Sequence, residues 1–314
     1  MRDITDKIIT LRTAKAQAIV FCKAATLELI KEKKIPKGDI LEFARAAGYF
    51  GAKKTADLIP HCHPIGIDSL EFTFDFLTES NYLHYTASSS FRSGIVVLCE
   101  AKYIGRTGIE IEAITSVSIA ALTIYDILKP LDDNLEVSSI RVVEKTGGRS
   151  GQRYFRTPPS CAVIVCSDST FEGKREDKSG KLVQKMLQDY EARVNEYIIL
   201  PDEKDAIQKK ILDLVEKDVQ FIFTTGGSGL GPRDTTVDAV KEIIERDADG
   251  ITEAMRNYGQ MRSPLAMMSR GVAGSIKHTT IVTLPGSSDG ARESMEAILP
   301  AVFHARKMLK GGGH

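Results

Sequence analysis

The sequence lacks an excess of charge of either sign. Its 314 residues include 42 lysines and arginines against 42 aspartates and glutamates, and each half of the chain is balanced as well. Proteins that bind nucleic acids or membrane surfaces without specificity usually carry a broad basic excess. The composition therefore argues against a general polyanion-binding protein, and we expect neither nucleic acid nor membrane among its partners.

The sequence also lacks long apolar runs and paired cysteines. No uninterrupted apolar stretch approaches the roughly 18 residues that a membrane span needs. The first residues, MRDITDKIITLR, are charged where a secretory signal would be apolar. The five cysteines form no CxxC pair, which argues against a disulfide framework and against a structural zinc site. We therefore expect a cytoplasmic protein.

The length of the chain indicates two domains, because 314 residues are many for a single hydrophobic core. The stretch GGRSGQRYFRTPPS, residues 147–160, contains three glycines and two adjacent prolines and has no apolar periodicity. Such a composition is typical of a linker. We predict a first domain over residues 1–150, a linker over 151–160 and a second domain over 161–314.

The first half mixes strand and helix patterns without strict alternation. Apolar spacing of three and four residues predicts helices over 37–58 and 109–129. Period-two patterns and short apolar runs predict strands over 70–76, 82–88, 94–100 and 137–143. Strands beside long helices indicate an α+β layered domain.

The second half alternates short apolar runs with helical patterns. The predicted strands cover 162–166, 194–200, 221–225 and 280–284, and the predicted helices cover 180–190, 203–215, 237–245 and 293–309. This alternation predicts an α/β three-layer domain with a mostly parallel sheet. The four predicted strands are followed by SDS, PDE, TTGGSG and PGSS, and ligands bind at that edge of such sheets.

Two of these polar loops contain candidate metal ligands. The loop TTGGSGLGPRDTT is neither a Walker A motif nor a GxGxxG motif, and an ordinary turn between a strand and a helix is the alternative. Asp202 and Asp234 follow two different predicted strands. Together they could hold Mg²⁺ between phosphate groups.

Three clusters in the first half carry polar chemistry. The sequence HCH at 61–63 is weak evidence for a metal and also suits a histidine that transfers protons or contacts phosphate. Lys145 and Arg149 flank two glycines, which suits phosphate, although the start of a flexible linker is the alternative. Glu110 and Glu112 can simply favour the helix dipole, and Asp126 and Lys129 can form an ordinary ion pair.

The spacing within the predicted helix bears on assembly. Glu112 and Asp126 are 14 residues apart, about 21 Å along a straight helix. They cannot contact one small substrate within the same helix. If both act on one molecule, a second copy of the chain must supply one of them, so we expect a homo-oligomer.

The segments AKKTADLIPHCHP, TGIEIEAITSVSIAALTIYDILK and EKTGGRSG resemble, in order, the motifs of the MoaC family of cyclic pyranopterin monophosphate synthases. The resemblance covers about residues 4–151. It implies a ferredoxin-like fold and the conversion of 3′,8-cyclo-7,8-dihydro-GTP into cyclic pyranopterin monophosphate and pyrophosphate. It implies catalytic roles for Asp126 and Lys129. Substrate-binding roles fall on Lys37, Lys53, His61, Cys62, His63, Glu110, Ile111, Glu112 and Lys145.

The same resemblance implies a site at a dimer interface within a hexamer, and no cofactor is expected for this domain. Two positions depart from the family's pattern. His61 stands where an apolar residue is usual before the Cys-His pair, and Ile111 stands where methionine is usual between the two glutamates. Both adjoin the expected pocket.

The segments SDSTFEGKREDKSG, LPDE, TTGGSGLGPRDTT, RSPLAMMSRGVAG and LPGSS resemble the MogA/MoaB family of molybdopterin adenylyltransferases, from about residue 161 to 313. The resemblance implies transfer of AMP from ATP to molybdopterin, with catalytic and metal-binding roles for Asp202 and Asp234. Pterin and nucleotide contacts fall on Asp168, Gly226, Gly227, Ser228, Gly229, Ser269, Arg270, Pro285 and Gly286. Ser228 replaces the usual threonine, and Ser288 replaces the usual proline.

Together the two resemblances predict a bifunctional enzyme of molybdenum-cofactor biosynthesis. We expect pterin and nucleotide small molecules as ligands, Mg²⁺ with ATP in the second domain, and a hexamer or trimer. Two alternatives stay open. The second domain can be a pterin carrier without catalysis, which the retention of Asp202 and Asp234 argues against. The first domain can be mainly an oligomerisation module, which the retention of His63, Asp126 and Lys129 argues against.

Overall fold

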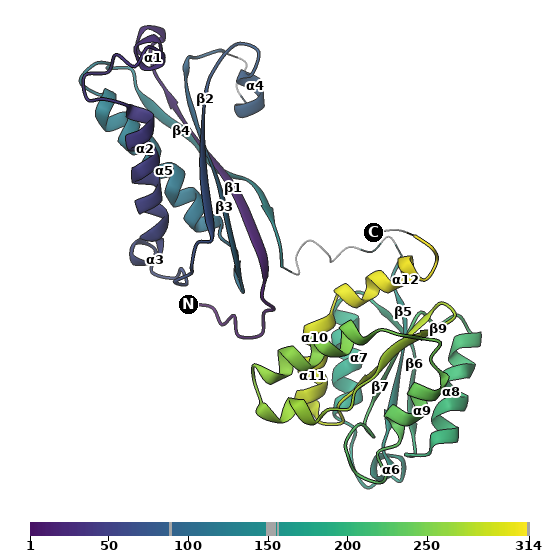
Figure 1. Cartoon of the computed structure of the whole chain (residues 1–314). Coiled ribbons are helices and arrows are strands. Elements are labelled where there is room, and N and C mark those ends of the chain that lie inside the picture. The colour runs from purple at the N-terminus through teal and green to yellow at the C-terminus, as the bar shows by residue number, and fades with distance from the viewer. Residues whose placement is uncertain (88–89, 149–154, 156, 313–314) are drawn as a thin grey trace. The chain divides into compact units, whose positions relative to one another are not determined.

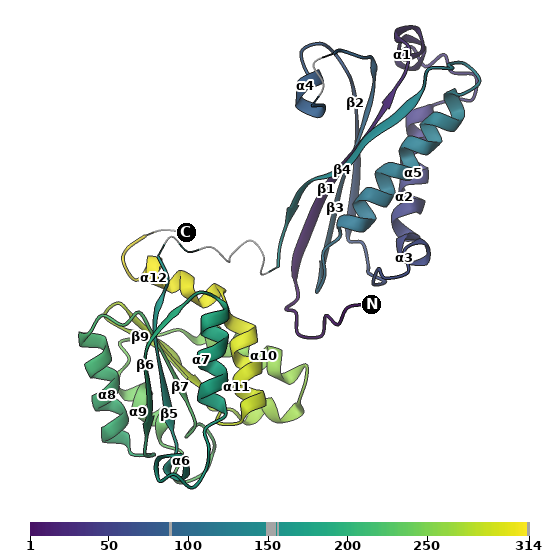
Figure 2. The ribbon, with the colours of Figure 1, turned by 180° about the vertical axis from the view of Figure 1, so that it is seen from behind.

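The computed structural model describes residues 1–87, 90–148, 155 and 157–312. The chain divides into two compact units, Met1–Gly151 and Gln152–His314, which are treated separately below (Figures 1 and 2). The division lies one residue from the predicted end of the first domain. Of the predicted linker, residues 151–154 and 156 lie outside the described residues, and so does Arg149 of the predicted phosphate-binding cluster.

Unit 1 is a four-stranded antiparallel sheet with helices on one face (Figures 1 and 2). The strand order is β2-β3-β1-β4, and every neighbouring pair is antiparallel. The elements follow the chain in this order: β1 (Thr10–Phe21), α1 (Ala24–Lys31), α2 (Ile40–Lys53), α3 (Thr55–Leu58), β2 (Ser69–Phe76), α4 (Tyr82–Tyr85), β3 (Gly94–Gly105), α5 (Glu110–Leu128) and β4 (Glu136–Thr146). The layered α+β arrangement agrees with the sequence pattern.

Two details of the sequence prediction for unit 1 are wrong. The predicted strand over 82–88 begins as the short helix α4, whose Tyr82 is buried beside Phe21. Just before it, the Asn81 side chain accepts from the Thr78 N–H and donates to the Phe76 carbonyl, which turns the chain away from the sheet. The predicted helix over 37–58 is divided at Lys54 into α2 and α3.

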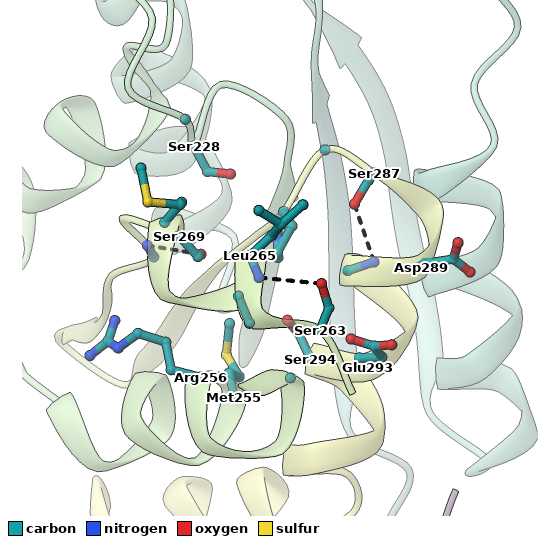
Figure 3. A pocket seen from close by; sticks show the side chains of 18 of the residues that line it. Ser228, Met255, Arg256, Ser263, Leu265, Ser269, Ser287, Asp289, Glu293 and Ser294 are labelled. Carbon is teal, nitrogen blue, oxygen red and sulfur yellow. Dashed lines mark hydrogen bonds between the residues drawn. The ribbon is translucent and has the colours of Figure 1, made fainter. Parts of the chain in front are cut away.

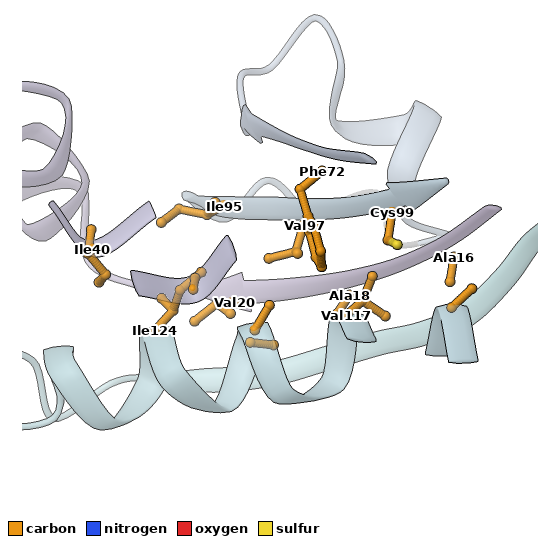
Figure 4. Packing of buried hydrophobic residues seen from close by; sticks show 14 of the residues in the cluster. Ala16, Ala18, Val20, Ile40, Phe72, Ile95, Val97, Cys99, Val117 and Ile124 are labelled. Atoms are coloured by element: carbon orange, nitrogen blue, oxygen red, sulfur yellow. The ribbon is translucent and has the colours of Figure 1, made fainter. Parts of the chain in front are cut away.

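The core of unit 1 lies between the sheet and α5. Val117 and Ile124 point from α5 toward Ala18 and Val20 of the central strand β1, and all four side chains are fully buried (Figure 4). Helix α5 is also long and apolar enough to cross a membrane by length and composition alone. Its packing against the sheet and α2 accounts for that composition, because a core helix is apolar for the same reason.

Unit 2 is a six-stranded sheet covered by helices on both faces (Figures 1 and 2). The strand order is β6-β5-β7-β10-β9-β8, in which the first four strands are parallel, β9 is antiparallel to β10, and β8 is antiparallel to β9. The strands are β5 (Ser160–Cys166), β6 (Arg193–Leu200), β7 (Phe221–Thr225), β8 (Arg246–Asp247), β9 (Ala273–Ile276) and β10 (Thr279–Leu284). The predicted mostly parallel sheet is confirmed.

The helices of unit 2 form the outer two layers. One core cluster joins the sheet to α7 (Ser179–Asp189), α10 (Asp249–Gln260) and α11 (Ser288–Ile298). A second cluster joins the other face to α8 (Lys204–Glu216) and α9 (Thr236–Ile243). The short elements are α6 (Asp168–Phe171), η2 (Pro264–Met268), η3 (Ala301–His304) and α12 (Ala305–Met308). The last predicted helix, 293–309, is wrong in its bounds, since α11 begins at Ser288 and ends at Ile298.

Candidate functional site

The four parallel strands of unit 2 bring their carboxyl ends to one edge of the sheet. Asp168 follows β5, Asp202 follows β6, the glycine loop 226–231 follows β7, and Pro285 and Gly286 follow β10. These segments are far apart in the sequence, and the parallel register places them together. The predicted residues of the second domain are therefore gathered into one region.

Asp168 and Asp202 hold each other in place through their backbones. The Asp168 N–H donates to Asp202 Oδ2 over 3.2 Å, and the Asp202 N–H donates to Asp168 Oδ1 over 3.0 Å. The Arg233 guanidinium pairs with the other oxygen of Asp168. Both oxygens of Asp168 thus have protein partners, which makes Asp168 a structural support for Asp202.

Asp202 itself keeps one oxygen without a partner. Asp202 Oδ1 is buried, and no described residue donates a hydrogen bond to it. Burial raises the pKa of Asp202, and the negative charges of Asp168 and Asp234 raise that pKa further. A buried carboxylate oxygen is costly to leave unpaired. This site is therefore suited to a cation.

The glycine loop closely approaches both candidate metal ligands. A side-chain carbon at Gly227 would lie 3.0 Å from Asp202 Oδ1, and one at Gly229 would lie 2.8 Å from Asp234 Oδ2. Glycine at both positions thus lets the backbone approach each carboxylate. Asp234 Oδ2 also accepts the N–H of Gly231 over 2.8 Å, which orients it.

The residues present fit Mg²⁺. Within the described ranges no group of three or more histidine, cysteine or acidic side chains could enclose a metal ion. Mg²⁺ usually takes only one or two protein carboxylates and completes its shell with water and substrate phosphates. Asp202 and Asp234, both close to the glycine loop and near enough for the charge of Asp234 to raise the pKa of Asp202, would be those two carboxylates.

The first glycine of this loop provides a stability test. Gly226 has a φ of +98°, and a side-chain carbon there would lie 2.1 Å from the Cys166 carbonyl oxygen. We expect Gly226→Ala to lower the free energy of unfolding of unit 2 by about 3 kcal/mol. Gly250→Ala is the control, because nothing lies within 4 Å of that position. Thermal unfolding measures both, and equal melting temperatures would contradict the assigned loop geometry.

Two cavities open at this edge of the sheet and share Gly227, Gly286 and Ser287 as a common wall. The larger has a volume of about 680 Å³ and the smaller about 320 Å³. Of the predicted residues, the larger is lined by Gly227, Ser228, Gly229, Asp234, Ser269, Pro285 and Gly286. The smaller is lined by Asp202, Gly226, Gly227 and Gly286. Most of the predicted contacts thus face a cavity.

The described lining of the two cavities does not include Asp168 or Arg270. The Arg270 guanidinium turns instead to Asp238 and to the carbonyl oxygens of Gly229 and Asp234, each at 3.4 Å. Arg270 therefore braces the loop that holds Asp234. The lining residues that the sequence did not indicate include those of α10, η2 and α11, among them Met255, Arg256, Leu265, Glu293 and Ser294 (Figure 3).

In unit 1 the start of α5 gathers the first group of predicted residues. Lys145 Nζ at the end of β4 lies 3.2 Å from Glu110 Oε1. Two residues further along the helix, Glu112 is 3% exposed, and the Cys62 thiol donates to its Oε1 over 3.4 Å. Ile111 between them is exposed. The loop of HCHP, the end of β4 and the start of α5 thus meet at one place.

Burial is the main reason that the pKa values of Cys62 and Glu112 are both raised. Burial, the nearby Glu112 carboxylate and the hydrogen bond to it together raise the pKa of the Cys62 thiol to about 11. Burial also raises the pKa of Glu112. A thiol with such a pKa is protonated at neutral pH and is a poor nucleophile. Cys62 is therefore placed to donate a hydrogen bond, not to attack a substrate.

The raised pKa of Glu112 predicts a pH-dependent gain in stability on substitution. The folded pKa of this buried carboxyl exceeds its ordinary value of 4.5. The free energy of unfolding therefore falls as the pH rises from 4.5 through the folded pKa, because the folded protein must then hold a buried charge. We expect Glu112→Gln to raise the free energy of unfolding measurably at pH 7, because the substitution removes the cost of ionising the buried carboxyl. The gain should vanish below pH 4.5. Urea unfolding at several pH values measures it, and a gain independent of pH would contradict the assignment.

Asp126 and Lys129 lie at the opposite end of α5. Lys129 Nζ donates to Asp126 Oδ1 over 2.6 Å, and both side chains are exposed. This hydrogen bond raises the pKa of Lys129 and lowers that of Asp126. The positive charge of Lys37 also lowers the pKa of Asp126. Lys37 therefore belongs to this second group. The two groups occupy opposite ends of the 19-residue helix.

The remaining predicted residues of unit 1 lie near the turn after α2. Lys53 is exposed at the last position of α2, and His61 is exposed in the loop after α3. His63 is half-buried, and its carbonyl oxygen lies 3.7 Å from the Cys62 sulfur. A metal site at 61–63 receives no support from the described residues, which contain no group of three metal-binding side chains.

Comparison with known proteins shows that both units of the chain match known families. Residues 1–148 match the MoaC family, and residues 162–304 match the "Probable molybdopterin binding domain". A cyclic pyranopterin monophosphate synthase of Mycobacterium tuberculosis is 44% identical over 48% of this chain and 81% of its own length. The molybdopterin biosynthesis enzyme MoaB of Thermus thermophilus is a solved structure with 39% identity and a TM-score of 0.46. It covers 48% of this chain and 96% of its own.

A relative that spans both units is the molybdenum cofactor biosynthesis bifunctional protein of Chlorobaculum tepidum. It is 37% identical over the whole of this chain and 96% of its own length. The two family matches also follow one another along the chain, one in each unit. The chain therefore belongs to the family of molybdenum cofactor biosynthesis bifunctional proteins, with a MoaC domain followed by a MogA/MoaB-like domain.

Proposed function

We propose that unit 1 converts 3′,8-cyclo-7,8-dihydro-GTP into cyclic pyranopterin monophosphate and pyrophosphate. The strand order β2-β3-β1-β4 with antiparallel neighbours supports the ferredoxin-like fold expected of a MoaC domain. The lysines at both ends of α5 suit a triphosphate. The Asp126–Lys129 pair supplies a proton acceptor and a proton donor for the ring rearrangement, and the cations stabilise the departing pyrophosphate.

The observation that carries this proposal is the separation of the two groups along α5. Glu112 and Asp126 are 14 residues apart on one helix, about 21 Å. One substrate can reach both groups only if a second copy of the chain supplies one of them. We therefore propose a homo-oligomer, a hexamer or trimer, whose site contains the start of one α5 and the end of another.

Mixed oligomers test this shared site. Lys129→Ala and Lys145→Ala each change an exposed side chain at a different end of α5, so neither should disturb folding. Each variant alone is expected to form almost no cyclic pyranopterin monophosphate. Co-expressed and purified together, the two should recover a substantial part of the activity, because some sites contain neither substitution. If mixed oligomers form but recover no activity, the proposal that each site is made from two copies is contradicted.

We propose that unit 2 transfers AMP from ATP to the phosphate of molybdopterin. The buried Asp202 Oδ1, which no described residue pairs, carries this proposal. It lies beside Gly227 of the glycine loop, Asp234 lies beside Gly229 of the same loop, and the two cavities share Gly227 as part of their common wall. Two adjoining cavities suit two substrates that exchange a group at their common boundary.

In this reaction the protein's own residues position the two substrates. Mg²⁺, held by Asp202 and Asp234, would neutralise phosphate charge when bound. Arg233 and Arg270 keep the two carboxylates in place through Asp168 and the glycine loop. Backbone N–H groups of the glycine loop and of the α11 start are suited to phosphate oxygens. Pyrophosphate is the leaving group.

The proposed location is the cytoplasm. All five cysteines are free, and four of them are buried. Free thiols are typical of proteins in reducing compartments. Small-molecule pterins and nucleotides are the proposed ligands of both units.

A further inference from the structure

The larger cavity of unit 2 contains a carboxylate that no described residue neutralises. Glu293 lies on α11, is half-buried and lines this cavity of about 680 Å³. Within the part of the chain that the structure describes, its side chain has neither a hydrogen bond nor an ion pair. Its neighbours on the same helix differ, because Asp289 and Glu296 both pair with Arg292.

The surroundings of Glu293 leave room for a ligand. A side-chain carbon at Gly259 of α10 would lie 2.9 Å from Ala266 Cβ and 3.8 Å from Glu293 Oε2. The missing side chain thus opens the wall opposite the carboxylate. Ser294, which is 5% exposed and also lines the cavity, has no side-chain hydrogen bond to any described residue. Figure 3 shows Glu293 and Ser294 together on this wall, next to Ser263, the residue before η2, with Leu265 of η2 nearby.

The charge of Glu293 limits what the cavity can bind there. A half-buried carboxylate repels phosphate and requires hydrogen-bond donors or a cation. Its two oxygens match two neighbouring N–H groups on one edge of a ligand, as carboxylates match guanidinium groups. The amino-pyrimidinone ring of a pterin has such an edge, made of the ring N3–H and the 2-amino group. Ser294 adds a hydroxyl that can donate or accept beside it.

We propose that Glu293 is a specificity-determining residue that binds the N3–H and 2-amino edge of the pterin substrate of unit 2. This inference rests on the proposed function. The pterin ring lies between α10, α11 and η2, and its phosphate side chain extends toward Asp234 and the glycine loop, which line the same cavity. The carboxylate thereby selects 2-amino pteridines over 2-oxo pteridines, whose O2 would face it with like charge.

Two fluorescent probes that differ at this edge test the proposal. They are 6-hydroxymethylpterin monophosphate, with a 2-amino group, and 6-hydroxymethyllumazine monophosphate, with a 2-oxo group. Titration of the full-length chain without ATP should give at least about tenfold tighter binding of the pterin. In Glu293→Gln the side-chain amide can pair with N3–H and O2 of the lumazine, so the preference should reverse.

The matched control is Asp289→Asn, which removes a negative charge from the same cavity at an exposed carboxylate already paired with Arg292. It should keep the preference of the wild type. Equal binding of the two probes by the wild type, no binding of either up to about 1 mM, or an unchanged preference in Glu293→Gln would each overturn the proposal. Thermal unfolding of the variant shows that it is folded.

The transfer reaction is measured separately, so the two proposals fail separately. If the chain shows the expected probe preference and Glu293→Gln reverses it, but no AMP is transferred, the proposed pterin site stands and the proposed transferase activity is wrong. If the chain transfers AMP but Glu293→Gln keeps the wild-type preference, the proposed transferase activity stands and the proposed specificity role of Glu293 is wrong.

Discussion

Replacement of Lys129 by alanine is expected to reduce the formation of cyclic pyranopterin monophosphate by about 10³-fold. Lys129 donates a hydrogen bond to Asp126 over 2.6 Å, and the two form the proposed pair of proton donor and acceptor. The substitution removes the donor and a cation near the triphosphate together. Because both side chains are exposed, the fold should be unaffected. The measurement is the initial rate of product formation by the full-length chain.

Lys31→Ala is the matched control for that loss. Lys31 forms the same kind of ion pair, with Glu28 three residues earlier on an exposed helix face. It lies outside the proposed site, so its replacement should leave the rate unchanged. If Lys129→Ala retained most of the activity, the Asp126–Lys129 pair would be an ordinary surface ion pair of little energetic consequence, and the proposed chemistry would lose its proton donor.

Replacement of Asp202 by asparagine is expected to reduce AMP transfer by about 10²–10³-fold. The substitution keeps the shape of the side chain and removes the negative charge on the buried oxygen that no described residue pairs. Burial raises the pKa of Asp202, so the ionised carboxylate costs stability at neutral pH and the variant should be at least as stable as the wild type. Loss of activity with unchanged or higher stability identifies a role in the reaction.

Asp205→Asn is the control for Asp202→Asn. Asp205 is an exposed carboxylate in the first turn of α8, three residues away and outside both cavities' described lining. Its replacement should leave the transfer rate unchanged. A second measurement is the Mg²⁺ dependence, since Asp202→Asn should require a higher Mg²⁺ concentration. Full activity of Asp202→Asn at the same Mg²⁺ concentration would remove Asp202 from the metal site.

The strand pattern of unit 2 could be read from the sequence because its signals are local. Each buried parallel strand is a short apolar run, and each is followed by polar or glycine-rich residues. The central strand β1 of unit 1 was not predicted, although it pairs with both β3 and β4. Its first half carries Arg12 and Lys15, while its second half is a continuous buried run. Neither half alone has the alternation that predicts a strand.

Only part of the candidate site in unit 2 could be predicted from the sequence. Asp202, Asp234 and the glycine loop follow strands directly, so sequence order and parallel topology place them at one edge. Glu293 and Ser294 are in the middle of a helix, and only the packing of α10, α11 and η2 makes them a cavity wall. The bracing role of Arg270 also depends on contacts across more than thirty positions in the sequence, which no local pattern contains.

The balanced charge of the chain is compatible with anionic substrates because the charges are placed locally. Lys37 and Lys129 gather at one end of α5, and Lys145 lies at the other. In unit 2 the acidic residues Asp202 and Asp234 are suited to a cation that accompanies phosphate. The net charge of zero therefore argues against a diffuse polyanion-binding surface and is compatible with specific phosphate sites.

The most direct test of the two proposed activities is one assay on the intact protein. A single preparation is given molybdopterin, ATP and Mg²⁺, after the same preparation has been shown to form cyclic pyranopterin monophosphate. We predict adenylylated molybdopterin and pyrophosphate in equal amounts, dependent on Mg²⁺. A preparation that forms cyclic pyranopterin monophosphate but yields no adenylylated product would contradict the account and leave unit 2 as a pterin carrier.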